Sequence, residues 1–144
     1  MTEVAFHFNA PDKWAYACRF ARKMVRSDMR LVITGAPDTL ATLDKMLWHM
    51  APQDFVAHCG AQDAPELLAA SPVVLLTDLR QAPHHVVLLN MGDEVPQGYT
   101  LFERLVEIVS AHDEFDRQCG RARWRQYTQS GHAIVRHDVV LKES

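Results

Sequence analysis

The chain has few of the residues on which metal, redox and nucleotide sites are commonly built. Its three cysteines lie far apart and form no Cys-x-x-Cys pair, so the sequence indicates neither a disulfide framework nor a zinc site. Only six residues are glycine, and no Gly-Lys-Ser/Thr or Gly-rich dinucleotide motif is present. The turn expected after the first strand reads Asn9-Ala10-Pro11-Asp12 instead. We therefore expect no bound cofactor and no nucleotide-binding loop.

Catalytic motifs are also missing. The eight histidines show no His-x-x-x-His or His-Glu-x-x-His spacing, and His137-Asp138 has no Gly-x-Ser-x-Gly turn to complete a hydrolase triad. Asp78 follows an apolar run, as a phosphoacceptor aspartate would, but the first strand is followed by Asp12 alone instead of an acidic pair. A turn-capping role for Asp78 is favoured. We expect no catalytic residue and no metal site.

Charge and hydropathy narrow the class further. The formal net charge is −3 and the pI is about 6.2, which argues against electrostatic wrapping of nucleic acid. No apolar run approaches the roughly 20 residues of a membrane span, and the first residues do not resemble a signal peptide. With 144 residues, 48% of them hydrophobic, the sequence predicts a single domain over residues 1–144 of a cytoplasmic protein, with no membrane contact.

Apolar runs of strand length alternate with helical patterns along the chain. Helices are predicted after Asp12 and Asp38, and a last helix runs from about Asp113 to a stop at Gly131. Period alone leaves Phe102 to Val109 open between helix and strand. Strands are predicted at residues 4–9, 31–34, 55–58, 72–77 and 85–90, the last two central in the sheet, and residues 133–141 as an extended tail. This order predicts a three-layer α/β sandwich on a mostly parallel sheet.

The strongest chemical signal is the segment from Arg117 to Tyr127, which places four arginines around a tryptophan in a chain of net negative charge. The segment itself contains no acidic residue. On a helix, one stripe would hold Arg117, Arg121, Trp124 and Arg125. The opposite stripe, expected to pack, would hold Phe115, Cys119 and Ala122.

Arginine forks bind carboxylates through two hydrogen bonds, and an aromatic ring beside them offers a surface for an apolar side chain. The stripe therefore predicts a site for an acidic peptide with a hydrophobic terminus. Two alternatives remain open. One is a solvated helix face, which is the usual meaning of a charge run, and the other is direct binding of single-stranded nucleic acid by the same arginines and Trp124.

Several motifs, taken in order, resemble one family. They are Leu43-Asp44-Lys45-Met46-Leu47-Trp48, Asp54-Phe55-Val56-Ala57-His58, the stretch from Leu88 to Pro96, and Arg121-Ala122-Arg123-Trp124 followed by Tyr127 and Gly131. Together they resemble the chi subunit of bacterial DNA polymerase III holoenzyme. The resemblance implies a Rossmann-like fold without a nucleotide-binding loop, and it implies a strand at residues 105–109.

The same resemblance implies a noncatalytic accessory role in DNA replication. In the family, chi pairs with the psi subunit to join the clamp loader and binds the acidic, phenylalanine-terminated tail of single-stranded DNA-binding protein (SSB), so that its contact with DNA is indirect. The positions matching the tail site are Arg117, Arg121, Trp124 and Arg125, with Arg121 expected to hold the terminal carboxylate. The positions matching the psi surface are Phe55 and Trp48.

Three residues fit the resemblance less simply. Trp48 continues the apolar stripe of the second helix, which by itself favours a place in the core. Gly120 departs from the family pattern and is expected to weaken the last helix by roughly 1 kcal/mol relative to alanine. His132 stands where the family often has an aromatic residue.

Overall fold

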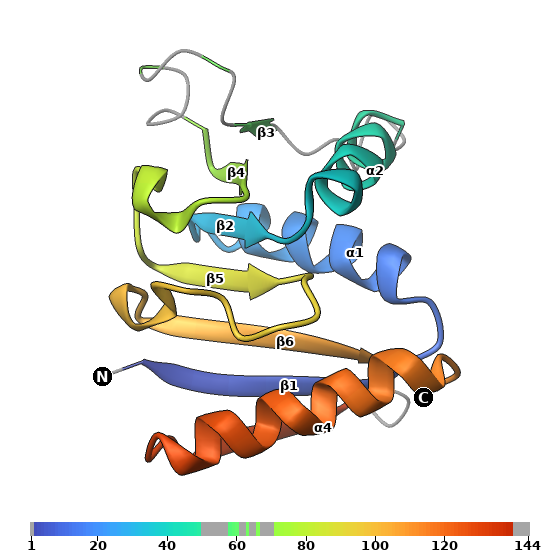
Figure 1. Cartoon of the computed structure of the whole chain (residues 1–144). Helices are drawn as coiled ribbons and strands as arrows, with labels where there is room; N and C mark the ends of the chain where they lie inside the picture. The colour runs from blue at the N-terminus through green and yellow to red at the C-terminus, as the bar shows by residue number, and fades with distance from the viewer. Residues whose placement is uncertain (1, 50–57, 61–62, 64–65, 67–70, 140–144) are drawn as a thin grey trace.

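The computed structural model describes residues 2–49, 58–60, 63, 66 and 71–139, and in this part of the chain seven strands form one parallel sheet (Figure 1). The strand order is β3-β4-β2-β5-β6-β1-β7. The strands are β1 (Glu3–Ala10), β2 (Leu31–Thr34), β3 (His58–Gly60), β4 (Val73–Leu76), β5 (Val87–Asn90), β6 (Arg104–Ser110) and β7 (Ile134–Asp138). The helices are α1 (Lys13–Arg26), α2 (Pro37–Trp48) and α4 (Glu114–Gln129), with short 3-10 turns η2 (Leu79–Gln81) and η3 (Tyr99–Leu101).

Helices cover both faces of the sheet, so the predicted three-layer α/β sandwich is confirmed. Helices α1 and α2 pack on one face, over Leu31, Ile33, Leu89 and Val106. Helix α4 lies across the other face, as Figure 1 shows, and its Tyr127 joins the core on that side. None of the helices in the described part is long and apolar enough to span a bilayer.

Strand β6 settles the segment that the hydrophobic period left open. It pairs in parallel with β5 and with β1, and its side chains alternate between the two cores, Leu105 on the α4 side and Val106 on the α1 side. The strand implied by the family resemblance is therefore confirmed. Strands β4 and β5 flank β2 and are buried throughout, as their continuous apolar runs predicted.

The segment expected as an extended C-terminal tail forms a strand of the sheet. Strand β7 lies at the sheet edge and pairs in parallel with β1, from Val4 opposite Ile134 to Phe8 opposite Asp138. The extended conformation expected here is confirmed for residues 134–138, but the pairing with β1 was not predicted, because it joins residues about as far apart as the chain permits. Local pattern carries no information on such a contact.

Local chemistry accounts for the helix ends that the sequence predicted. The carboxylates of Asp12 and Asp113 cap α1 and α4 by accepting backbone hydrogen bonds from Ala15 (3.1 Å) and Asp116 (3.2 Å). Helix α4 ends at Gln129 with Ser130 as its C-cap, and the next residue, Gly131, has a left-handed φ of 91°. There the N–H of His132 donates to the carbonyl of Tyr127 at 3.1 Å, which satisfies a carbonyl of the last turn in the Schellman pattern.

The packing face of α4 differs from the predicted one. The buried stripe holds Asp116, Gly120, Arg123 and Tyr127, whereas Phe115 is 64% exposed. The prediction was wrong because it assigned the buried face by hydropathy alone. Polar side chains occupy this face because each is paired: Asp116 with Lys13 at 2.7 Å, and Arg123 with Glu107 at 3.0 Å.

Close packing of α4 against β6 explains why residue 120 is a glycine. A Cβ atom at this position would lie 2.9 Å from Cγ2 and 3.3 Å from Cγ1 of Val109 on β6. Both distances are shorter than the usual 3.5–4.0 Å between non-bonded carbons. The glycine thus lets α4 approach the sheet closely, an advantage that the propensity argument did not include.

Candidate functional site

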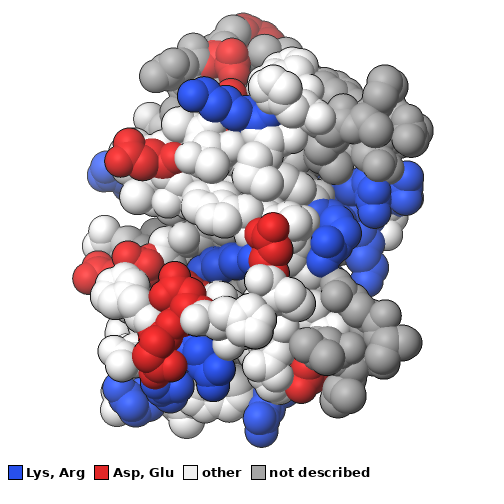
Figure 2. Space-filling model, turned by 90° about the vertical axis from the view of Figure 1, so that its right-hand side faces the viewer, with Lys and Arg blue, Asp and Glu red and all other residues white. Residues whose placement is uncertain are grey.

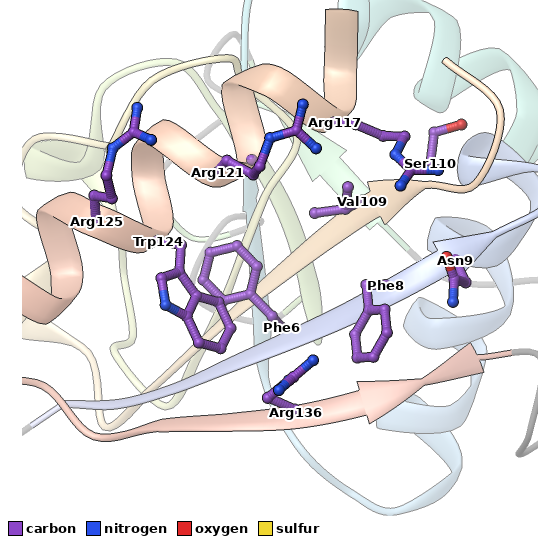
Figure 3. A pocket seen from close by; sticks show the side chains of 11 residues that line it. Phe6, Phe8, Asn9, Val109, Ser110, Arg117, Arg121, Trp124, Arg125 and Arg136 are labelled. Carbon is purple, nitrogen blue, oxygen red and sulfur yellow. The ribbon is translucent and has the colours of Figure 1, made fainter. Parts of the chain in front are cut away.

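A cavity of about 480 Å³ opens beside α4. Its walls come from four elements: α4 on one side, β1 and the end of β6 beneath, and β7 opposite the helix (Figure 3). The lining residues are Phe6, Phe8, Asn9, Val109, Ser110, Arg117, Gly120, Arg121, Trp124, Arg125 and Arg136. We refer to this cavity as the α4 pocket.

All four residues of the predicted stripe line this pocket: Arg117, Arg121, Trp124 and Arg125. The helical period predicted correctly that they share one side of the helix. The fourth arginine of the segment, Arg123, is fully buried on the packing face and does not line the pocket. Three helix arginines, and not four, therefore face a possible ligand from α4.

The rim of the pocket is not uniformly basic. The guanidinium of Arg121 lies 3.0 Å from a carboxylate oxygen of Glu114, and Arg117 lies 4.0 Å from the same carboxylate while donating a hydrogen bond to the carbonyl of Ala111 at 3.0 Å. Acidic residues directly adjoin basic ones on the neighbouring face of the molecule (Figure 2). Although residues 117–127 contain no acidic side chain, the charges of Arg117 and Arg121 are partly neutralised by Glu114, which lies one turn before the segment. Exposed pairs of this kind contribute little and are readily exchanged for a ligand carboxylate.

The floor of the pocket is apolar and aromatic. Trp124 meets Phe6 edge to face, with ring centroids 5.0 Å apart, and packs as a partly buried residue on the core of that side. Phe8 and Val109 continue this surface toward the end of β1 (Figure 3). The tryptophan is therefore both a packing residue and a pocket residue. An apolar side chain placed here would bury area against rings at the foot of a cationic wall.

A buried polar network fixes α4 on the sheet beneath the pocket. Glu107 of β6 accepts hydrogen bonds from Arg123 (3.0 Å), from Asn90 (2.9 Å) and from the Tyr127 hydroxyl (2.6 Å). Burial raises the pKa of Glu107, while Arg123 and the two hydrogen bonds act in the opposite direction. Burial and the neighbouring Glu107 raise the pKa of Tyr127, so its hydroxyl stays a donor. Arg123 also donates to the carbonyl of Asp93 at 2.9 Å, which joins the helix to the loop after β5.

Seven of the eleven lining residues were not predicted from the sequence, among them Phe6, Phe8 and Arg136. The alternation of Phe6 and Phe8 along the first strand was a readable signal that both face one side of the sheet. No such signal existed for Arg136. It reaches the pocket because β7 pairs with β1 in a register that sets Arg136 opposite Phe6.

The remaining predicted site residues lie elsewhere. Trp48 is 56% exposed at the end of α2, so the expectation of a core position was wrong, and its ring centroid lies 4.9 Å from that of His58. Phe55 lies outside the described residues. Asp78 caps the η2 turn, as predicted, and pairs with Arg80 at 2.8 Å. No group of three or more potential metal ligands occurs among the residues with described positions.

These features define a Rossmann-like α/β domain that lacks a glycine-rich phosphate loop and carries, beside its last helix, a basic pocket with an aromatic floor. The family model described as DNA polymerase III chi subunit, HolC, matches residues 1–135 of the chain. The chain therefore belongs to the chi subunit family and has an accessory role in DNA replication. A search of curated proteins gave no match.

Proposed function

We propose that this chain is a noncatalytic, cytoplasmic adaptor that joins SSB to the clamp loader of the polymerase III holoenzyme. The α4 pocket binds the acidic, phenylalanine-terminated tail of SSB. Trp48 and Phe55 contribute to binding of the psi subunit, which connects the chain to the clamp loader. Contact with DNA is then indirect, through SSB.

The observation that carries this proposal is the convergence of a cationic wall and an aromatic floor in one pocket. A terminal phenylalanine ring fits against Phe6 and Trp124, while Arg121 takes the terminal carboxylate. Arg117 and Arg125 attract the preceding aspartates. Two charge-assisted hydrogen bonds of roughly 1.5–3 kcal/mol each and one buried aromatic side chain of about 1.5–3 kcal/mol sum to roughly 4.5–9 kcal/mol, a range that includes the −8 kcal/mol of micromolar affinity.

The psi surface is supported by the exposure of Trp48. Leu43 and Leu47, earlier on the same helix, are fully buried, whereas Trp48 is 56% exposed. A large aromatic side chain exposed at the end of an element is a frequent anchor of protein interfaces. This surface and the α4 pocket lie on different elements, so their ligands should bind independently.

A crossed binding experiment tests both halves of the proposal. The probes are a short peptide with an aspartate run ending in Pro-Phe, titrated by calorimetry, and the psi subunit of the same organism, used in a pull-down. Arg121→Ala should weaken peptide binding at least tenfold and leave psi recovery unchanged, and Trp48→Ala should do the opposite. Undiminished peptide binding by Arg121→Ala would show that the tail site is misassigned.

Direct binding of single-stranded DNA by the same arginines is the competing function. An oligonucleotide titration at physiological salt separates the two, because the net charge of −3 and the acidic residues beside the pocket disfavour a phosphate backbone. Little affinity is expected without SSB. Submicromolar oligonucleotide binding that is lost in Arg121→Ala would favour the competing function.

A further inference from the structure

The α4 pocket has a cation on the wall opposite the helix. Arg136 of β7 extends over two rings of the pocket, with its guanidinium carbon 5.4 Å from the ring centroid of Phe8 and 5.7 Å from that of Trp124. Figure 3 shows this guanidinium between the two rings, across the floor from Arg121. A guanidinium stacked on rings in this way is positioned before any ligand arrives.

The arginines of the pocket differ in whether a carboxylate of the protein already lies beside them. Arg117 and Arg121 lie beside Glu114. For Arg125 and Arg136, no carboxylate of the described residues lies within ion-pair distance. The ring contacts of Arg136 use the faces of its guanidinium and leave N–H groups at the edge of the plane available for hydrogen bonds.

We propose that Arg136 is a second carboxylate-binding residue of the α4 pocket, and that it pairs with an acidic side chain of the bound peptide. This inference rests on the proposed function, in which Arg121 holds the terminal carboxylate. The ligand is then a peptide that meets cations on both walls while its terminal side chain lies on the floor between them. Arg136 makes the pocket selective for an acidic residue upstream of the apolar terminus, and not merely for a free C-terminus.

Matched peptides and variants test this pairing. The first peptide has an aspartate run followed by Pro-Phe with a free carboxylate, the second replaces the aspartates with asparagines, and the third is the first with a terminal amide. Each is titrated against the wild-type protein and three variants: Arg136→Gln, Arg136→Lys and Lys23→Gln. Lys23 is an exposed residue of α1, on the other side of the sheet, and its substitution removes the same charge from the protein.

Arg136→Gln should weaken the aspartate peptide about tenfold and the asparagine peptide less than twofold. It should weaken the amide peptide as much as the acid, because its partner is a side chain. Arg136→Lys, which keeps the charge but loses the planar stacking, should lie between wild type and Arg136→Gln. Lys23→Gln should bind all three peptides as the wild type does.

The possible failures are distinguishable. If Arg136→Gln weakens the aspartate and asparagine peptides by the same factor, Arg136 only supports Trp124 and the pairing is refuted. If its effect disappears with the amide peptide, the partner is the terminus and the assignment is wrong. If the wild-type protein binds none of the peptides, the proposed function itself fails, and this inference fails with it.

Discussion

Gly120→Ala is the substitution for which local propensity and tertiary packing predict opposite signs. On an isolated helix, replacing glycine by alanine should stabilise by about 1 kcal/mol. In this protein the new Cβ would lie 2.9 Å from Cγ2 of Val109, well inside the usual contact distance. Valine is stiff at χ1, so its methyl groups have few ways to move aside.

The expected change in the free energy of unfolding combines the cost of overpacking with the gain in helix propensity. Forcing an extra methyl group into a packed contact costs about 1–3 kcal/mol, and the helix propensity offsets about 1 kcal/mol of that cost. Gly120→Ala should therefore lower the free energy of unfolding by about 1 kcal/mol, within a range of roughly 0–2 kcal/mol. Helix propensity alone, by which Gly120 is a weak point of the helix, would predict stabilisation.

The sign should reverse in a Val109→Ala background. That substitution removes both Cγ atoms and leaves Cβ of residue 109 at 3.7 Å from the new methyl group, an ordinary contact. Adding Gly120→Ala to Val109→Ala should then raise the unfolding free energy by about 1 kcal/mol. Urea denaturation of the four proteins of the cycle measures both changes, since each is taken as a difference at similar m-values.

The reasoning would be refuted if Gly120→Ala were stabilising in both backgrounds, because α4 would then have room to shift. It would also fail if the two effects were simply additive. Since Gly120 and Val109 both line the α4 pocket, the single variant should bind the aspartate peptide more weakly as well. The same titrations used for Arg136 provide that measurement.

Two further predictions concern buried polar groups. Tyr127→Phe removes the 2.6 Å hydrogen bond to Glu107, so that only Asn90 still donates to that carboxylate oxygen. The substitution should lower the free energy of unfolding by about 1–3 kcal/mol in urea denaturation, and a change below about 0.5 kcal/mol would contradict this. Burial lowers the pKa of His84, with Arg30 and His85 acting in the same direction, so the unfolded chain binds the proton first as pH falls. Stability should therefore decline as pH drops below about 6.5, and His84→Gln should reduce that slope between pH 7 and 5; an unchanged slope would exclude His84 as its source.

Most of the fold could be predicted because its signals are local. Continuous apolar runs predicted the buried strands β4 and β5, and capping residues such as Asp12 and Gly131 predicted the helix ends. Two features required tertiary information. The pairing of β7 with β1 joins the two ends of the described chain, and the buried face of α4 is polar, so hydropathy selected the wrong side.

The candidate site likewise has a part that the sequence predicted and a part that required tertiary information. The helical period placed Arg117, Arg121, Trp124 and Arg125 together because they lie on one continuous element. The opposite wall comes from β7, and its Arg136 could not be assigned without the strand register. Glu114 was overlooked because it precedes the arginine segment by one turn, although that spacing brings it beside Arg117 and near Arg121.

One arginine of α4 is buried and fixes the helix, whereas three others line the pocket, and their direction depends on the buried one. Arg123 is buried and held by Glu107, so the helix has a fixed rotation about its axis. Successive residues turn by 100°, which places Arg121 and Arg125 about 200° from Arg123, toward the pocket. If the buried pair were lost, the helix could rotate, and its arginines and Trp124 would turn away from Phe6 and Phe8 of β1. The network beneath the helix therefore determines which arginines are available to a ligand, although none of its members lines the pocket.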